Sequence, residues 1–408
     1  MSTFDSLWES TLDVGKDPAC GGYNRFAWTT EDLVLREWFA GCAADRGMDV
    51  EEDRNGNVWA WWRPRLWSGD PKGAFVTGSH LDSVPGGGAF DGPLGIVSAF
   101  AAIDILKARG VEPKVAVAVV AFADEEGARF GVACVGSKLS TGALPPEKAL
   151  NLRDGDGVTL AEAIKKAGRD PNHVGRDEDL ADKVGVYVEL HVEQGRALDL
   201  LGRPIGLASA IWPHGRWRFD FCGEANHAGT TRLADRRDPM LAFATAVHAA
   251  RARAAAHDAV ATFGKVLVTP NGANAIPSQV RAWLDARAAD EATLLSLVES
   301  ITAHADRDCG ESGLSVSVHA ESVTPVVDFS AEVRAKVQQS LAYLGDVPVL
   351  STAAGHDAGV LSGTVPTAML FVRNPSGVSH SPLEHAELSD CRVGAEALAA
   401  VMADWTSW

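Results

Sequence analysis

The sequence has no apolar run approaching the roughly 18 residues that a membrane-spanning helix needs. It also lacks a basic cluster. Its 37 Lys and Arg residues are outnumbered by 54 Asp and Glu residues, which gives a formal net charge of −17. A chain this acidic is poorly suited to neutralising phosphates, so we expect neither nucleic acid nor an anionic membrane as a partner. The amino terminus shows no basic flank followed by an apolar stretch, so we expect a cytoplasmic protein without a signal peptide.

Paired cysteine spacings, internal repeats and low-complexity tracts are also missing. The six cysteines are scattered along the chain: Cys20, Cys42, Cys134, Cys222, Cys309 and Cys391. This spacing excludes a cysteine-based zinc site and favours reduced thiols, in keeping with a cytoplasmic protein. Cys134 lies nearest to the polar motifs described below.

The 408 residues, 46% of them hydrophobic, are sufficient for a large core and for more than one domain. Predicted strands near 57–62, 74–79 and 114–123 alternate with predicted helices over 29–47 and 93–109. Such alternation is typical of an α/β fold with a doubly wound, mainly parallel sheet. The polar segment 151–178, with one short helical patch, is predicted to be a surface excursion.

From about residue 211 the pattern changes to β-α-β-β-α-β, which is the order of a ferredoxin-like α+β unit. Its predicted elements are strand 215–223, helix 238–256, strands 262–269 and 278–287, helix 290–306 and strand 314–322. The chain then returns with strands near 347–350 and 366–372 and a helix over 386–405. We therefore predict a catalytic domain made of residues 1–210 and 326–408, with an inserted lid or dimerisation domain over 211–325.

A glycine-rich polar segment follows the predicted strand at 74–79. His80 ends the strand, and Asp91 lies in the loop Gly86-Gly87-Gly88-Ala89-Phe90-Asp91-Gly92. An imidazole nitrogen and a carboxylate oxygen are ligands that borderline divalent metals accept. Asp82 is placed to accept the second N–H of the imidazole and so fix its tautomer. We therefore predict a site here rather than a plain polar loop.

Two further predicted strands end in residues of the same kind. Glu125 and Glu126 follow the apolar run 115–121, so that one carboxylate can bind a metal while its neighbour transfers a proton. His191 lies at the end of a third strand, and Gln194 beyond it offers a donor and an acceptor suited to an amide or ureido group. The carboxyl ends of strands are where open α/β sheets place their sites.

The later histidines are of two kinds. His227 follows an alternating strand, 216–221, and is better suited to donate to a developing oxyanion than to bind a metal. Gly355-His356 and Ser379-His380 each supply a late histidine, and periodicity alone does not choose between His356 and His380 as a ligand.

Taken together, six motifs in this order resemble the dinuclear-metal M20 amidohydrolases. The resemblance is to the branch of N-carbamoyl-L-amino acid hydrolases, allantoate amidohydrolases and β-ureidopropionases, and it extends over nearly the whole chain. The motifs are His80-Leu81-Asp82, the glycine-rich loop through Asp91, Glu125-Glu126-Gly127, His191-Val192-Glu193-Gln194-Gly195, Asn226-His227-Ala228-Gly229-Thr230-Thr231 and Ser379-His380-Ser381-Pro382.

The resemblance implies two divalent metal ions per subunit, and Zn, Mn, Co and Ni all accept such ligands. It implies His80 and His191 on one ion, Glu126 and His380 on the other, and Asp91 bridging both. It also implies Glu125 as the general base and gives His356 a supporting role. Substrate-binding positions carry over to Gln194, His227, Asn274 and Arg287. At Arg287, a guanidinium fork suits a substrate carboxylate.

The resemblance further implies a homodimer formed through the inserted domain, so lid residues could serve their own subunit or its partner. The expected reaction is hydrolysis of the C–N bond of a linear ureide; an N-carbamoyl amino acid would give an amino acid, carbon dioxide and ammonia. Allantoate, β-ureidopropionate and N-acyl amino acids are alternatives that the metal motifs do not separate. Departures from the family pattern at Arg232, Pro277-Ser278 and Arg373 bear on substrate identity. A non-catalytic binding protein on this fold is disfavoured, because Glu125 and every expected ligand are present.

Overall fold

The structure is a computed structural model that describes residues 3–64 and 73–406. It divides into two compact units, of which unit 1 comprises Met1–Ser209 with Asp328–Trp408 and unit 2 comprises Ala210–Val327. The first two and last two residues of the predicted catalytic domain, 1–2 and 407–408, lie outside the described ranges.

Unit 1 is built on a sheet that has nine strands within the described residues. Its strands are β1 (Asp49–Glu52), β2 (Val58–Trp62), β4 (Val117–Phe122), β3 (Ala74–His80), β5 (Val184–Val192), β15 (Thr367–Val372), β6 (Ile205–Ile211) and β13 (Val327–Asp328) in spatial order, with β14 (Val349–Thr352) on β6. The central strands β4, β3, β5 and β15 run parallel, whereas β1–β2, β2–β4 and β15–β6 are antiparallel. The predicted mainly parallel sheet is confirmed. Because its central strands are parallel, their carboxyl ends share one edge.

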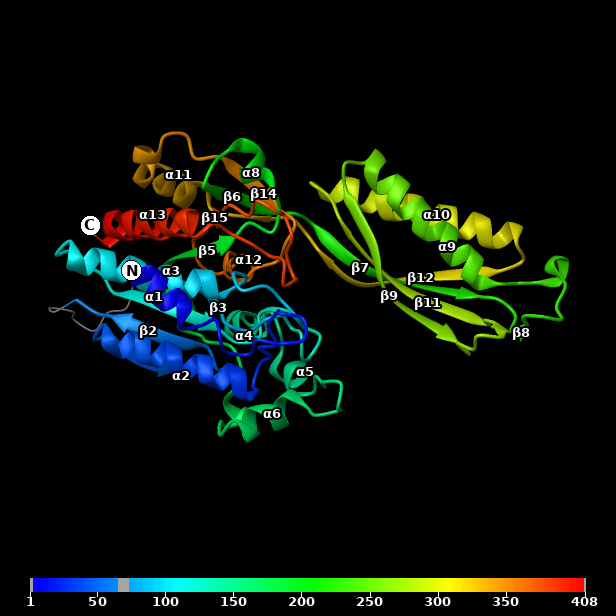
Figure 1. The fold of residues 1–408 in the computed structure, drawn as a ribbon, viewed down its shortest axis with the longest axis horizontal. Coiled ribbons are helices and arrows are strands. Elements are labelled where there is room, and N and C mark those ends of the chain that lie inside the picture. The colour runs from blue at the N-terminus through cyan, green and yellow to red at the C-terminus, as the bar shows by residue number, and fades with distance from the viewer. Residues whose placement is uncertain (1–2, 65–72, 407–408) are drawn as a thin grey trace. The chain divides into compact units, whose positions relative to one another are not determined.

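Helices cover both faces of this sheet. Val188 and Leu190 of β5 belong to the main apolar core, which also includes residues of α1 (Thr3–Glu9), α2 (Thr30–Asp45), α3 (Pro93–Ala108), α11 (Ala331–Ser340) and α13 (Leu388–Thr406). Glu189, between those two residues, instead contacts Ala358 of α12 (Asp357–Leu361). Successive side chains of a strand point to opposite faces, so α3 and α12 lie on opposite sides of the sheet. Figure 1 shows α1, α3 and α13 grouped together in unit 1.

The segment predicted to be a surface excursion shares a small apolar cluster with residues that precede it in the chain. Its short helix, α6 (Leu160–Lys166), begins with a capping box formed by Thr159 and Glu162. Leu160 and Ile164, one turn apart, are buried in an apolar cluster that also contains residues of α4 (Val135–Thr141) and α5 (Pro146–Leu150). The helical patch is confirmed. Most of the segment 151–178 is exposed or half-buried, as expected of a surface excursion, and the apolar i, i+4 pair packs its helix against the rest of the unit.

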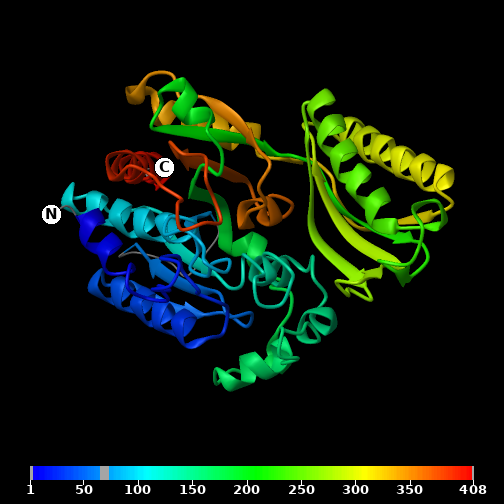
Figure 2. The ribbon, with the colours of Figure 1, turned by 45° about the vertical axis from the view of Figure 1, so that its right-hand side comes forward.

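Unit 2 is a four-stranded antiparallel sheet with two helices. Its elements are β7 (His214–Cys222), α9 (Pro239–Ala256), β9 (Val260–Thr269), β11 (Gln279–Arg287), α10 (Glu291–Glu311) and β12 (Ser315–Thr324). The strand order β12-β7-β11-β9 and the β-α-β-β-α-β chain order are those of a ferredoxin-like unit, which confirms the predicted fold class. Helices α9 and α10 lie side by side on one face, as Figure 2 shows.

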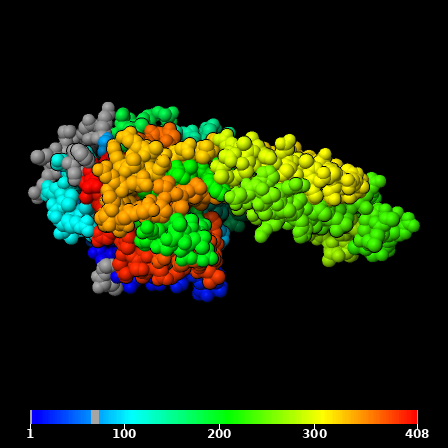
Figure 3. Space-filling model, turned by 90° about the horizontal axis from the view of Figure 1, so that it is seen from above, coloured from blue at the N-terminus to red at the C-terminus, as the bar shows by residue number. Residues whose placement is uncertain are grey.

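The remaining elements are short. They are α7 (Leu180–Lys183), α8 (Ala197–Leu201), β8 (Asn226–His227), β10 (Ala275–Ile276) and three 3-10 turns at Pro171–His173, Leu233–Asp235 and Ala342–Leu344. Figure 3 shows a face of unit 1 on which α8 and α11 lie at the surface. None of the helices in the described ranges is both long and apolar enough to span a membrane. All six cysteines are free, as the sequence predicted.

Candidate dinuclear metal centre

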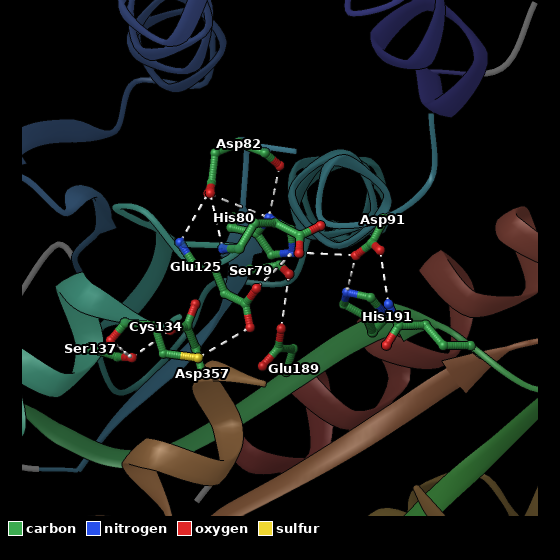
Figure 4. Close-up of polar contacts among 12 residues, drawn as sticks. Ser79, His80, Asp82, Asp91, Glu125, Cys134, Ser137, Glu189, His191 and Asp357 are labelled. Carbon is green, nitrogen blue, oxygen red and sulfur yellow. Dashed lines mark hydrogen bonds and ion pairs between the residues drawn. The ribbon is translucent and has the colours of Figure 1, made fainter. Parts of the chain in front are cut away.

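The carboxyl ends of the central parallel strands bring the candidate ligands of unit 1 together. His80 is the last residue of β3, His191 lies at the end of β5, and the turn after β4 carries Glu125 and Glu126. His380 follows β15 in a loop and has a φ of 54°. Figure 4 shows His80, Asp91, Glu125 and His191 converging from these separate elements. Residues more than 100 positions apart thus form one cluster because a parallel sheet aligns strand ends.

Asp91 lies at the centre of the cluster. Its Oδ1 is 3.2 Å from Nε2 of His191 and 3.5 Å from Nε2 of His80, whereas its Oδ2 is 3.4 Å from Nε2 of His380. Three groups of potential ligands result within the described residues, and two of them contain Asp91: His80, Asp91 and His191 form one, and Asp91, Glu126 and His380 the other, whereas the third consists of Glu189, His191 and His356. Within each group the ligand atoms lie within 4.8 Å of one another.

The hydrogen bonds of the two buried histidines direct their lone pairs into the site. Nδ1 of His80 is 3.0 Å from the main-chain carbonyl oxygen of Asp82, and Nδ1 of His191 is 2.9 Å from that of Val192. A carbonyl can only accept, so Nδ1 carries the proton and Nε2 the lone pair in each neutral ring. In the described part of the chain, Nε2 of both rings and Oε1 of Glu126 are buried without a hydrogen-bond partner. Buried lone pairs of this kind suit a metal ion.

The charge of the cluster also suits cations. Burial, followed by the nearby charge of Asp91, raises the pKa of Glu126 to about 8. Burial likewise raises the pKa of Glu125 well above its usual value. Burial would also raise the pKa of Asp91, but the imidazoles of His191 and His80 beside it outweigh burial and hold that pKa well below the usual range. The site therefore gathers more carboxylates than its side chains neutralise, and divalent cations fit this donor set.

Asp82 organises the turn that carries the glutamate pair. Its carboxylate accepts hydrogen bonds from the main-chain N–H groups of Glu125 at 3.1 Å and Glu126 at 3.0 Å. The sequence suggested that this carboxylate would accept from His80, but its Oδ1 lies 3.6 Å from Nδ1 of that ring, farther than the Asp82 carbonyl oxygen. Asp82 thus links the strand end of His80 to the turn after β4.

Sequence reasoning missed two buried glutamates next to the cluster. Oε1 of Glu384 accepts from the main-chain N–H groups of Phe90 at 2.9 Å and Asp91 at 3.0 Å, which fixes the backbone of the central carboxylate. Glu189 accepts from Ser79 at 2.9 Å and from the N–H of Ala358 at 3.0 Å. A charged residue in the apolar strand β5, two positions before His191 and so on the same face, was a readable signal for Glu189.

Gln194 and His356 also lie against the cluster. Nε2 of Gln194 donates to Oδ2 of Asp91 at 2.8 Å and to the Ser379 hydroxyl at 3.2 Å. The ring of His356 is buried, with its centroid 4.5 Å from that of His191. Burial lowers the pKa of His356 well below its usual value, so this ring is neutral beside the two ligand groups.

In unit 2, two of the three predicted substrate-binding residues lie together and the third lies apart. His227 is on β8, which pairs with β10, and the main-chain oxygen of Asn274 accepts from the N–H of Ala228 at 3.0 Å. Arg287 ends β11, eight residues beyond Gln279, which pairs with the last residue of β7. At about 3.3 Å per residue these two ends of β11 are roughly 25 Å apart.

The three arginines considered for substrate binding, Arg287, Arg232 and Arg373, each form an ion pair with an aspartate. Arg287 contacts Asp285 with Nε at 2.8 Å and Nη2 at 3.2 Å. Arg232 pairs with Asp235, and Arg373 pairs with Asp390. Any role in substrate binding therefore competes with an existing carboxylate of the same unit.

The chain is similar to known proteins over nearly its whole length. A family profile described as Peptidase family M20/M25/M40 matches residues 76–404. The chain is 37% identical to an N-carbamoyl-L-amino acid amidohydrolase of Geobacillus stearothermophilus, over 97% of this chain and 96% of the relative. It is 32% identical to an allantoate amidohydrolase of Escherichia coli strain K12, over 98% of both chains. A crystal structure of a hydantoinase/carbamoylase family amidase from Burkholderia vietnamiensis superposes with a TM-score of 0.88 at 30% identity, covering 100% of this chain and 97% of that one.

Proposed function

The chain belongs to peptidase family M20/M25/M40, as a hydrolase of the hydantoinase/carbamoylase amidase branch that acts on C–N bonds, and we propose that its substrate is an N-carbamoyl-L-amino acid. The products would be an amino acid, carbon dioxide and ammonia. The observation that carries the proposal is the 37% identity, over nearly the full length of both chains, to a protein named for this activity. The two ligand groups that share Asp91 support the hydrolytic chemistry.

We propose that these two groups hold two divalent ions. His80 and His191 would bind one, Glu126 and His380 the other, and Asp91 both, while Zn, Mn, Co and Ni all suit such ligands. When bound, a pair of ions supplies a lowered water pKa and a polarised carbonyl. Asp82 and Glu384 keep the main chain of Glu126 and Asp91 in place through their N–H groups, so the ligands do not have to be ordered when the ions bind.

Glu125 is the proposed general base. It takes the proton of the attacking water and returns it to the nitrogen that leaves. Two features support this role: the carboxylate is buried, and its Oε2 lies 3.8 Å from Nε2 of His80, on the side of the ligand groups. A proton carrier must reach the reacting atoms without itself being a main ligand, and Glu125 belongs to neither group around Asp91.

The substrate contacts are proposed for Gln194, His227, Asn274 and Arg287. His227 donates to the developing oxyanion, Gln194 and Asn274 bind polar groups of the ureide, and Arg287 holds the carboxylate. The separation of roughly 25 Å between the two ends of β11 is longer than a small ureide. We therefore propose that His227 and Arg287 reach one substrate from two different copies of unit 2, in a homodimer.

A substrate panel tests the proposal. The purified enzyme, supplied with Mn²⁺ or Zn²⁺, is assayed for ammonia and amine release from N-carbamoyl-L- and D-amino acids, N-carbamoyl-β-alanine, allantoate and N-acetyl-L-amino acids. We expect the highest kcat/KM for an N-carbamoyl-L-amino acid. Allantoate is the second candidate, because of the 32% identity to an allantoate amidohydrolase over 98% of both chains. Faster turnover of allantoate than of every carbamoyl compound would replace the first assignment with the second.

A further inference from the structure

His227 is held by its own loop in one orientation. Its Nδ1 accepts main-chain hydrogen bonds from Gly229 at 3.0 Å and Thr230 at 3.2 Å. A ring nitrogen that accepts hydrogen bonds carries the lone pair, so the proton of the neutral ring is on Nε2. The loop thus makes the outer nitrogen of His227 a donor.

Burial against other side chains does not explain the fixed orientation of the His227 ring, because His227, Gly229 and Thr230 are all exposed. Arg236 closes the loop instead. Its Nη2 donates to the carbonyl oxygens of Ala228 at 2.7 Å and Thr231 at 3.0 Å, and its Nε donates to Thr231 at 3.1 Å. These two carbonyls flank the pair of N–H groups that face His227. One guanidinium therefore bridges both sides of the turn that supplies the two donors.

Gly229 provides a second, independent constraint on the same contact. A Cβ atom at this position would lie 3.2 Å from Cε1 and 3.5 Å from Nδ1 of His227. The first distance is tighter than an ordinary van der Waals contact, so a side chain here would displace the ring. Glycine lets the main-chain N–H approach the imidazole.

We propose that Arg236 is a positioning residue that fixes the tautomer of His227. By holding the carbonyls of Ala228 and Thr231, it keeps the N–H groups of Gly229 and Thr230 on Nδ1, and so keeps the proton on Nε2. The consequence for catalysis rests on the proposed function, in which His227 donates to an oxyanion. The other tautomer would present a lone pair to that oxyanion and repel it.

The test uses the full-length enzyme and proton–nitrogen correlation spectra of its histidine rings, in the high-pH plateau of the titration. The His227 signals are assigned from their loss in His227→Gln. In the wild type we expect a single neutral tautomer with the proton on Nε2. Arg236→Ala should give a mixture of tautomers, and Arg236→Lys should restore part of the original signal. Gly229→Ala should give a mixture with Arg236 intact.

The matched control is Arg232→Ala, which removes an arginine of the same loop that pairs with Asp235. Its spectrum should keep the wild-type tautomer. A single Nε2–H tautomer in Arg236→Ala or Gly229→Ala, or a mixture in the wild type, would overturn the inference.

Kinetics separate this inference from the proposed function. For the best substrate of the panel, Arg236→Ala should lower kcat by up to about 10²-fold, the scale of losing one oxyanion donor, with KM changed much less. If the tautomer shifts while kcat stays at the wild-type value, the positioning role of Arg236 holds and the donor role of His227 is overturned.

Discussion

Oε1 of Glu125 accepts a hydrogen bond from the Cys134 thiol at a buried contact of 3.3 Å. The second oxygen, Oε2, lies 3.8 Å from Nε2 of His80. One oxygen is thus restrained by a weak donor while the other faces the ligand groups. Burial raises the pKa of the Cys134 thiol well above its usual value, so the thiol keeps its proton and remains a donor. This arrangement suits a carboxylate that transfers protons.

The first prediction concerns that carboxylate. Glu125→Gln should retain the fold and both metal ions but lower kcat by at least ~10², the scale of a positioned acid–base group. An amide of nearly equal size keeps the contacts of the turn while removing the proton acceptor. Steady-state kinetics with metal analysis of the same sample checks this. Near-normal turnover with full metal content would exclude Glu125 as the base.

The second prediction concerns the metal ions. The buried lone pairs on His80, His191 and Glu126 predict two divalent ions per subunit and loss of activity on chelation. The metal-free protein should also have a lower Tm, because ions that bind only the native state stabilise it. His380→Ala should reduce the metal content from two toward one. His385→Ala, five residues on at an exposed position paired with Glu387, is the matched control. Full activity after complete metal removal would contradict the proposed centre.

Much of the fold was predictable because its signals are local. The apolar runs of β3 and β4 are buried along their whole length, which is typical of central parallel strands, and unit 2 follows the alternating pattern of its strands. The missed elements are short or polar. Helix α11, for example, buries only Val333 and Val337 and has no apolar stripe long enough to stand out.

The site was predictable only in part, for a related reason. His80 and His191 end predicted strands, so the sheet itself implies that they meet. Glu384 reaches the main chain of Asp91 from a position 293 residues away, and no local pattern carries that contact. The hydrogen bond from Gln194 to Asp91 depends in the same way on how loops fold over the sheet edge. The residue types in the sequence were enough to predict the kind of chemistry. The hydrogen-bond partners of each side chain were not predictable, because they depend on tertiary contacts.

The third prediction concerns the substrate carboxylate. Arg287→Ala should lower kcat/KM more than tenfold, because a charged hydrogen bond is worth ~1.5–3 kcal/mol. Amidating the substrate carboxylate should cost a similar factor in the wild type, and the two losses should not add, because each removes the same contact. Arg216→Ala is the control, since Arg216 contacts Asp285, the acid that also holds Arg287. If Arg287→Ala still discriminates fully against the amidated substrate, Arg232 and Arg373 become the residues to test.

The fourth prediction concerns which subunit supplies His227. Glu125→Gln and His227→Ala should each be nearly inactive alone. If His227 serves the partner's site, a mixed dimer has one site that combines an intact Glu125 with an intact His227. Random pairing of equal amounts makes half of the dimers mixed, so activity should recover to about a quarter of the wild-type value after the subunits exchange. Mixing either variant with itself is the control. If mass spectrometry shows mixed dimers but activity does not recover, His227 acts within its own subunit. In that case the separation of His227 from Arg287 would exclude a substrate contact shared by these two residues.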